Sequence, residues 1–247
     1  MTARPIRIRY QFATAKHQTE VGQAEVDRRL AKLRGWVSGD VDVDIGLPQS
    51  GPGSVESRTD AALTVPELLR GVVAAEREGC HVVIVSCYSD PGMEAARELV
   101  SIPVIGSGQS SMHVAAQLGG RFSIIAPGSG GGSRAYENPR KYGLGQSHVS
   151  TRGVGLSVMD LAKDRERTLA RIAEVGRQAV EEDRAEILIL GCMSMAFHDI
   201  TGELGERIGV PVVNPVPASL SLAEYLVRAG LSHSRAAYPA PPKRDFV

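Results

Sequence analysis

A short buried-strand pattern that ends in a cysteine occurs twice in this chain. Residues 82–86 are Val-Val-Ile-Val-Ser and lead to Cys87, and residues 187–190 are Ile-Leu-Ile-Leu and lead, after Gly191, to Cys192. Continuous apolar runs of this length are typical of parallel strands that are buried on both faces. We therefore expect each cysteine at the carboxyl end of a central strand, where α/β proteins bind ligands.

The similarity between these two stretches extends past the cysteines. Each cysteine is followed by a helical segment, a Pro-Val pair that opens another short strand, and a second helix. Three positions of that second helix recur at one constant offset of 108 residues: Ser111 and Ser219, Ala115 and Ala223, and Leu118 and Leu226. A repeat of this kind indicates two related supersecondary units. We predict an α/β fold of two halves, residues 1–107 with 216–247 and residues 108–215, each carrying one thiol.

Composition narrows the class of protein. The 247 residues include 28 basic and 28 acidic side chains, so no net charge attracts nucleic acid or a membrane surface. The first residues lack the apolar core of a signal peptide and no apolar run is long enough to span a bilayer, so we expect a cytoplasmic protein. Cys80, Cys87 and Cys192 are an odd set without metal-ligand spacing, which argues against a disulfide framework and against a metal site. Cys80 is expected to be a packed thiol.

Strands and helices alternate along the chain. The expected strands are 6–12, 41–45, 81–86, 121–125, 153–158 and 186–190, and the expected long helices are 19–33, 66–78 and 164–182. The Pro/Gly/Ser-rich loop 47–58 follows a strand, at the edge where α/β units bind ligands, so Glu56 and Ser57 are candidate substrate-binding residues. The plainer alternative is that they are solvated loop residues.

Two segments rich in glycine or proline are expected to be irregular. Residues 127–133 directly follow a predicted strand but lack the lysine, the Ser/Thr and the glycine spacing of a nucleotide-binding loop. We expect this run to be a mobile flap or linker. The proline-rich tail from Tyr238 is expected to lie extended on the surface or to be disordered.

Five short segments carry a resemblance to a known family: Gly51-Pro-Gly-Ser-Val-Glu-Ser57, Cys87-Tyr-Ser-Asp-Pro-Gly92, Arg140-Lys-Tyr-Gly143, Ala179-Val-Glu-Glu-Asp183 and Leu190-Gly-Cys192-Met-Ser-Met195. They are similar to the hydantoin and allantoin racemase branch of the aspartate/glutamate racemase superfamily. The resemblance implies two Rossmann-like lobes with parallel sheets related by pseudo-twofold symmetry and an active site in the interlobe cleft. It also implies no cofactor, a small-molecule substrate held between two thiols, and a homo-oligomer.

Some positions depart from that family's pattern. An Asn-Pro-Asn-Thr-like turn is usual after the first strand, and here the stretch is Tyr10-Gln-Phe-Ala-Thr14; a Thr pair is frequent where this chain has Ala126-Pro127. The resemblance places these residues near the substrate: Gln11, Thr14, Ala126, Pro127 and Pro215. We expect a substrate that is anionic or contains an amide. The altered positions predict that it is bulkier or less polar than simple hydantoins, aspartate or glutamate.

Two thiols suit the inversion of a carbon acid. A base must remove the proton from one face and an acid must return it to the other, so two groups have to act on one carbon. The thiol pKa of about 8.5 falls at a helix N-terminus, and both Cys87 and Cys192 precede helical segments. Backbone N–H groups after each cysteine are the expected donors to the developing oxyanion: Tyr88, Ser89, Met193 and Ser194.

The sequence therefore predicts a cofactor-independent racemase or epimerase in which Cys87 and Cys192 are catalytic. Alternatives within the superfamily are a dicarboxylate cis–trans isomerase and a decarboxylase, of which the second needs only one thiol. A non-catalytic two-lobed ligand-binding protein is the alternative from another class. Asp90 either caps the helix after Pro91 or holds a polar group near Cys87. His198 is a further acid/base candidate, although a structural role at a helix start is the plainer interpretation.

Overall fold

The chain divides into two compact units. In this computed structural model, which describes residues 5–20 and 22–243, unit 1 comprises the residues up to Ser107 together with those from Ser219, and unit 2 comprises Gly108–Ala218. The chain leaves unit 1 inside the first turn of helix α4 (Ser107–Leu118) and returns to it inside helix α10 (Pro215–Arg228). Unit 2 is thus an insertion within unit 1.

Unit 1 contains a parallel sheet of four strands in the order β2-β1-β3-β4. The strands are β1 (Ile6–Phe12), β2 (Val41–Gly46), β3 (Val82–Ser86) and β4 (Val104–Gly106). The helices between them are α1 (Gly22–Trp36), α2 (Arg58–Arg77) and α3 (Met93–Leu99). Every residue of β3 is buried, as expected for a central parallel strand covered by helices on both faces.

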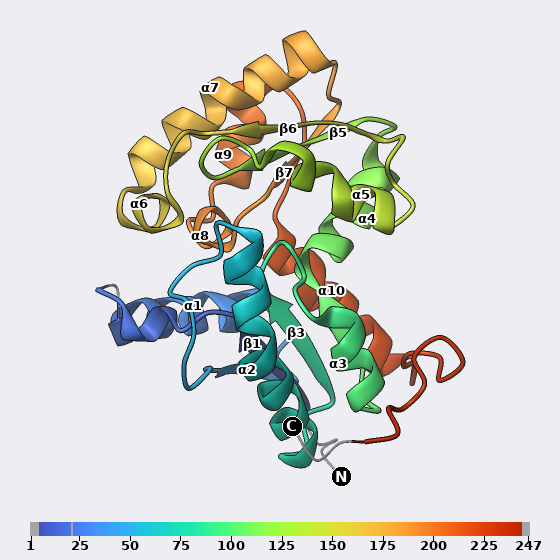
Figure 1. Ribbon diagram of the computed structural model, residues 1–247. Coiled ribbons are helices and arrows are strands. Elements are labelled where there is room, and N and C mark those ends of the chain that lie inside the picture. The colour runs from blue at the N-terminus through green and yellow to red at the C-terminus, as the bar shows by residue number, and fades with distance from the viewer. Residues whose placement is uncertain (1–4, 21, 244–247) are drawn as a thin grey trace. The chain divides into compact units, whose positions relative to one another are not determined.

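Side chains on the two faces of β1 show which helices cover the sheet. Gln11 lies against Gly71 of α2, whereas the Phe12 ring, on the opposite face, is 5.5 Å from the Arg29 guanidinium carbon of α1. Because neighbouring residues of a strand point to opposite faces, α1 and α2 cover opposite faces of the sheet. Helices α2 and α3 lie side by side over one of them (Figure 1).

Unit 2 repeats this plan. Its parallel sheet has the order β6-β5-β7-β8, with β5 (Phe122–Ala126), β6 (His148–Gly153), β7 (Ile187–Leu190) and β8 (Val212–Val213). The helical segments are the 3-10 helix η2 (Gly132–Tyr136), α5 (Glu137–Lys141), α6 (Val158–Lys163), α7 (Arg165–Asp183), α8 (Met193–Ala196) and α9 (Thr201–Ile208). Helix α7 lies along β5 and β6 (Figure 1) and buries Leu169, Ile172 and Ala173 in the core.

The strand order of unit 2 matches that of unit 1 strand for strand, which confirms the predicted fold class of two parallel α/β units. The equivalence extends to the helices that follow β4 and β8. Ser111 and Ala115 of α4 are fully buried, and so are Ser219 and Ala223 at the corresponding positions of α10. Two of the three recurring pairs thus share a packing environment, whereas Leu118 is exposed and Leu226 is half-buried.

Two predicted element boundaries were wrong, each for an identifiable reason. Helix α2 begins at Arg58 and contains Pro66, which we had placed at its start; the true start is set by a capping box of Ser57 and Asp60. The strand predicted over 153–158 is instead the segment that leads into α6, and β6 occupies His148–Gly153. The alternating Val154, Leu156 and Val158 are buried from a loop, while β6 is an edge strand with few apolar residues.

Residues 231–238 are held against the free edge of β4 by specific contacts. The His233 Nε2 atom accepts a hydrogen bond from the Val104 N–H at 2.7 Å, and the buried Arg97 guanidinium donates to the Val104 carbonyl from two nitrogens. Arg97 also donates to the Tyr238 hydroxyl at 3.1 Å and lies 5.3 Å from its ring centre. The end of the proline-rich tail that we expected to be extended or disordered, residues 244–247, lies outside the described residues, and the first residue of that tail, Tyr238, is docked by these contacts. The segment 231–238 as a whole is docked. It covers the polar groups of an edge strand, which are otherwise open to pairing with other chains.

Within the described ranges 5–20 and 22–243, no helix is both long enough and apolar enough to cross a membrane.

We predict that acid loosens this tail. Burial, with the Arg97 charge next in size and Arg235 adding to it, lowers the pKa of His233 from 6.5 to about 4. The unfolded chain therefore binds the proton more readily, so the stabilisation is complete above pH 6.5 and is lost as the pH falls toward 4. Amide hydrogen exchange of residues 231–238, corrected for its intrinsic pH dependence, should rise about tenfold from about pH 7.5 to about pH 5. In a His233→Gln variant this rise should be absent; an equal rise would contradict the assignment.

Candidate active site

Cys87 directly follows β3 and begins a tight turn. Its Sγ atom lies 3.3 Å from the Ser89 hydroxyl, and the turn is closed by a hydrogen bond from the Asp90 N–H to the Cys87 carbonyl at 3.1 Å. The thiol and Tyr88 are half-buried, and Ser89 is exposed. The thiol thus stands at the carboxyl end of the central strand of unit 1, next to a hydroxyl that is able to exchange a hydrogen bond with it.

Asp90 is not the N-cap residue of α3, which was one of the two roles expected for it. The N-cap residue of α3 is Gly92, in the left-handed region at φ 65°, and no side chain caps this helix. Asp90 itself has φ 48° and is only 2% exposed. Its carboxylate lies against Gly106, the last residue of β4, where an added Cβ atom would come within 2.7 Å of the Asp90 Cγ and Oδ2 atoms. The carboxylate therefore connects the Cys87 turn to the end of the next strand.

The hydroxyl groups of Tyr10, Ser86 and Ser107 form a cluster next to the Cys87 turn. Burial raises the pKa of Tyr10 to about 12, opposed by a hydrogen bond to the Ser86 side chain, then by the Arg29 charge, and by a bond to Ser107. Ser107 in turn donates to the Val85 carbonyl at 2.8 Å. Tyr10 therefore remains a neutral phenol at physiological pH and joins the ends of β1, β3 and β4.

The other residues proposed in unit 1 have different surroundings. Gln11 is fully buried between β2 and α2, because a Cβ atom on Gly46 or Gly71 would collide with its amide. Thr14 is half-buried in a loop that is anchored by a hydrogen bond from the Ala15 N–H to the Pro52 carbonyl. Ser57 is the N-cap residue of α2, and the exposed Glu56 accepts a hydrogen bond from Ser54. The Glu56 N–H also donates to the Asp60 carboxylate at the start of α2, at 3.1 Å.

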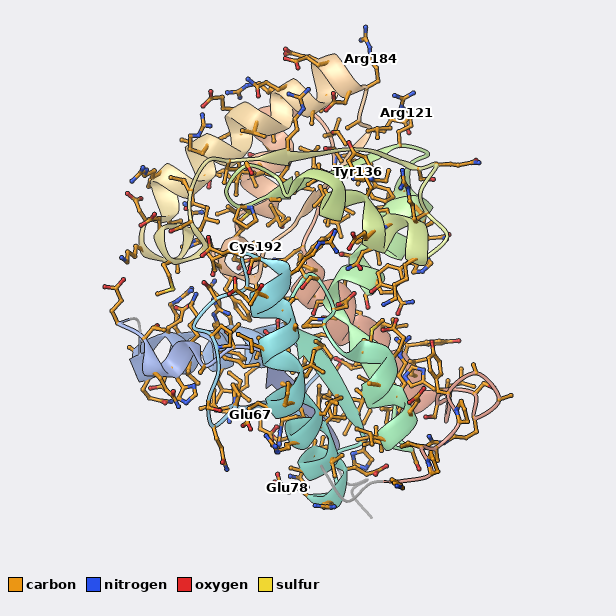
Figure 2. The ribbon with its side chains drawn as sticks, in the orientation of Figure 1. Glu67, Glu78, Arg121, Tyr136, Arg184 and Cys192 are labelled. Carbon is orange, nitrogen blue, oxygen red and sulfur yellow. The ribbon has the colours of Figure 1, made fainter. Side chains whose placement is uncertain are left out.

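Cys192 occupies the corresponding place in unit 2 (Figure 2). It follows β7 after Gly191, whose Cα packs so closely on β5 that a Cβ atom would lie 2.7 Å from Ile124 Cγ2. Cys192 is 7% exposed and is the N-cap residue of α8; its carbonyl accepts hydrogen bonds from the Met195 and Ala196 N–H groups, both at 3.1 Å. The proposed donors Met193 and Ser194 form the first turn of this helix and are buried.

Asn214 is a polar residue of unit 2 that sequence reasoning missed. Its Nδ2 atom donates to the Ala196 carbonyl, the end of α8, and its Oδ1 atom accepts from the Val216 N–H, both at 3.0 Å. The Pro215 that we had proposed as a substrate contact begins α10 immediately after it. An Asn before a helix-compatible Pro is a capping signal that could have been recognised.

The remaining candidates of unit 2 are held by the backbone. The carbonyl of Ala126 accepts from the Val154 N–H at 3.0 Å, and the glycine run after Pro127 is tied to residues 155–156 by two further backbone bonds. Gly153 packs on this run so closely that a Cβ atom would lie 2.2 Å from the Gly128 carbonyl oxygen. The start of the run is thus a hydrogen-bonded turn, and the mobile flap or linker that we expected over 127–133 stays a prediction. The His198 ring bonds to the Leu161 carbonyl at 2.5 Å, which supports its structural interpretation.

Among the residues placed in the structure, no group of three His, Cys, Asp or Glu side chains is arranged to bind a metal ion.

Two parallel α/β units with one strand order, each with a cysteine turn after its third strand, define a duplicated α/β protein with one thiol at the strand ends of each unit. The chain belongs to the Asp/Glu/hydantoin racemase family, which it matches over residues 25–223. Its enzyme class is accordingly that of the isomerases. The resemblance noted in the sequence is thereby confirmed.

Individual relatives support this family assignment. A hydantoin racemase from Pseudomonas sp. (strain NS671) is 33% identical over 201 residues, which cover 81% of this chain and 80% of that protein. A hydantoin racemase from Paenarthrobacter aurescens is 31% identical over 81% of this chain and 85% of that protein. The allantoin racemase structure from Pseudomonas fluorescens superposes with a TM-score of 0.87 at 27% identity, covering 97% of this chain and 98% of that one.

We predict that Ser57 is needed for stability and not for binding. The Ser57→Ala variant should lose about 1 kcal/mol of unfolding free energy, measured by urea denaturation, because the Asp60 N–H loses its acceptor at the start of α2. Ser54→Ala, which removes a hydroxyl bonded to the exposed Glu56, is the control and should change stability by less than about 0.5 kcal/mol. Unchanged stability with a raised KM would instead assign Ser57 to the substrate.

Proposed function

We propose that this chain is a cofactor-independent racemase or epimerase in which Cys87 and Cys192 act on opposite faces of one carbon acid. The observation that carries the proposal is the equivalence of the two thiols. Each follows the third strand of its unit, and each begins a turn closed onto the cysteine carbonyl. A buried cysteine at a strand end is ordinarily a packing residue, but two in matched positions supply what an inversion requires: one acid and one base.

The reaction divides between the two thiols. One thiolate removes the α-proton, the electron pair of the C–H bond moves toward the adjacent carbonyl oxygen, and the other thiol delivers its proton to the opposite face. The same steps run backward for the other enantiomer, so each cysteine is base for one hand and acid for the other. Each direction of the reaction therefore starts with one thiol deprotonated and the other carrying its proton.

Stabilisation of the developing oxyanion has to supply most of the driving force. The α-proton of such a carbon acid lies on the order of ten pKa units above a thiol, which corresponds to about 14 kcal/mol. Backbone N–H groups are suited to this role because they are fixed before the reaction begins. The candidates are the groups of the two turns: Tyr88, Ser89, Met193 and Ser194.

For the substrate we propose a cyclic amide of the hydantoin type with an apolar substituent on the reacting carbon. The relatives named hydantoin racemase and allantoin racemase support the ring. The substituent is inferred from the end of β5, where the half-buried Ala126 and Pro127 stand in place of polar turn residues. At the end of β1, Phe12 and Ala13 also replace polar turn residues, but each is only 2% exposed and offers no surface to a substrate. A free amino acid would find less polar anchorage there.

Removal of either thiol should abolish racemisation but leave exchange of the α-hydrogen with solvent for one of the two enantiomers. In D₂O with EDTA present, Cys87→Ser and Cys192→Ser should each exchange the α-hydrogen of only one enantiomer of 5-benzylhydantoin, with opposite preference. The reason is that the remaining thiolate is able to abstract and return a proton on its own side. NMR on each pure enantiomer, corrected for the reaction without enzyme, measures this exchange.

The matched control is Cys80→Ser. Cys80 is also buried, and burial raises the pKa of its thiol, so it is a poor base. This variant should stay within about twofold of the wild type. If either of the other two variants still racemises, a different residue serves that face and the two-thiol mechanism is wrong.

Substrate preference is tested separately. We expect kcat/KM for 5-benzylhydantoin to exceed that for allantoin or aspartate by about tenfold or more, a difference of about 1.4 kcal/mol in transition-state binding. Circular dichroism follows racemisation of each pure enantiomer. Equal or faster turnover of aspartate would show that the apolar strand ends do not select the substrate.

A further inference from the structure

In each unit, one polar side chain connects the cysteine turn to the end of the following strand. In unit 2 this side chain comes from the strand end, and in unit 1 it comes from the turn. In unit 2 the connecting residue is Asn214, at the end of β8. It is 8% exposed and bonds at once to the Ala196 carbonyl, the last residue of the α8 turn, and to the Val216 N–H of α10. One side chain thus joins the Cys192 turn to the helix that leaves the sheet.

In unit 1 the same junction is bridged from the turn. The residue that corresponds to Asn214, 108 positions earlier, is Gly106 at the end of β4, which has no side chain. The carboxylate of Asp90 lies against its Cα atom. The residue that corresponds to Asp90 in unit 2, 105 positions later, is the buried and apolar Met195.

The junction in unit 1 has no room for a second side chain. A side chain at position 106 would meet the Asp90 carboxylate at 2.7 Å and the Met93 sulfur atom as well, so Gly106 is required where Asp90 is present. The polar residue thus stands after the strand in unit 2, as Asn214, and in the turn in unit 1, as Asp90. Asp90 also adopts a left-handed backbone that most residues avoid, which Asp tolerates better than most because its short side chain bonds locally.

We propose, on the basis of the function proposed above, that Asp90 and Asn214 are the positioning residues of Cys87 and Cys192 respectively. The turns alone do not fix the position of a thiol. Helix α8 has four residues, and helices this short are not stable in isolation. A misplacement of about 1 Å is enough to cost about 10²-fold in rate. The two bridges fix each turn against the rigid end of its sheet.

The test removes the hydrogen bond from Asn214 to the Ala196 carbonyl, which is the bridge, and keeps the hydrogen bond that Asn214 accepts from the Val216 N–H. Asn214→Asp keeps an oxygen for the Val216 N–H but replaces the Nδ2 donor with an oxygen that faces the Ala196 carbonyl. Deuterium exchange into the enantiomer of 5-benzylhydantoin that Cys192 serves, as assigned with the Cys→Ser variants, should fall about tenfold or more. Exchange into the other enantiomer should stay within about twofold. Asp90→Gly, which removes the side chain that lies against Gly106 but keeps tolerance of the left-handed backbone, should show the converse.

Asp164→Ala is the matched control for a structural effect. Asp164 is the N-cap residue of α7 in unit 2 and accepts from the Arg167 N–H at 3.0 Å, so its loss destabilises the unit without touching the cysteine turn. Both enantiomers should remain within about twofold in this variant. If Asn214→Asp slows both enantiomers equally, or neither, Asn214 has no positioning role.

A readout without substrate distinguishes failure of this proposal from failure of the proposed function. Amide hydrogen exchange of residues 193–198 should rise about tenfold in Asn214→Asp, while that of residues 88–92 stays unchanged. Unaltered protection of 193–198 would overturn the bridge even if the two thiols prove catalytic. Faster amide exchange in residues 193–198 would support the bridge even if another residue replaces one of the two thiols in the reaction.

Discussion

The burial of both faces of a parallel sheet is the constraint on which the rest of this structure depends. Strands such as β3 have no solvent face, so helices must cover them on both sides, and the polar side chains of such a strand stand at its ends. The carboxyl ends are therefore the places where reactive groups are able to leave the core. Cys87 and Cys192 stand at two such ends, and the residues around them serve mainly to hold short turns in place.

The repeat was readable in the sequence because its signal is local. Continuous apolar runs identified β3 and β7, and the amphipathic pattern of 164–182 identified α7 almost to the residue. β6 could not be found in this way, because an edge strand with a polar sequence has no period of its own. The start of α2 was missed for a different reason: Pro66 is a strong local signal for a helix start, yet it lies inside a longer helix that Ser57 and Asp60 begin.

The site was predictable only in part, for reasons of long-range contact. The thiols follow from the repeated pattern, but the surroundings of Gln11 depend on Gly46 and Gly71, which are 35 and 60 residues away in the chain. Asp90 illustrates the same limit, because an Asp-Pro-Gly sequence is a good helix-start signal and the glycine that admits its carboxylate lies on another strand. Gly106 looks like any strand-end glycine until the two are seen together.

The order of the two units along the chain has a consequence for synthesis. Unit 2 is encoded without interruption, whereas unit 1 needs α10 and the segment 231–238 to cover its sheet and the edge of β4. During synthesis, unit 2 is therefore able to complete its contacts before unit 1 does. The sheet of unit 1 stays partly uncovered until residues about a hundred positions further along the chain have been made. The strand edges of this sheet are therefore open to pairing with other chains during that interval.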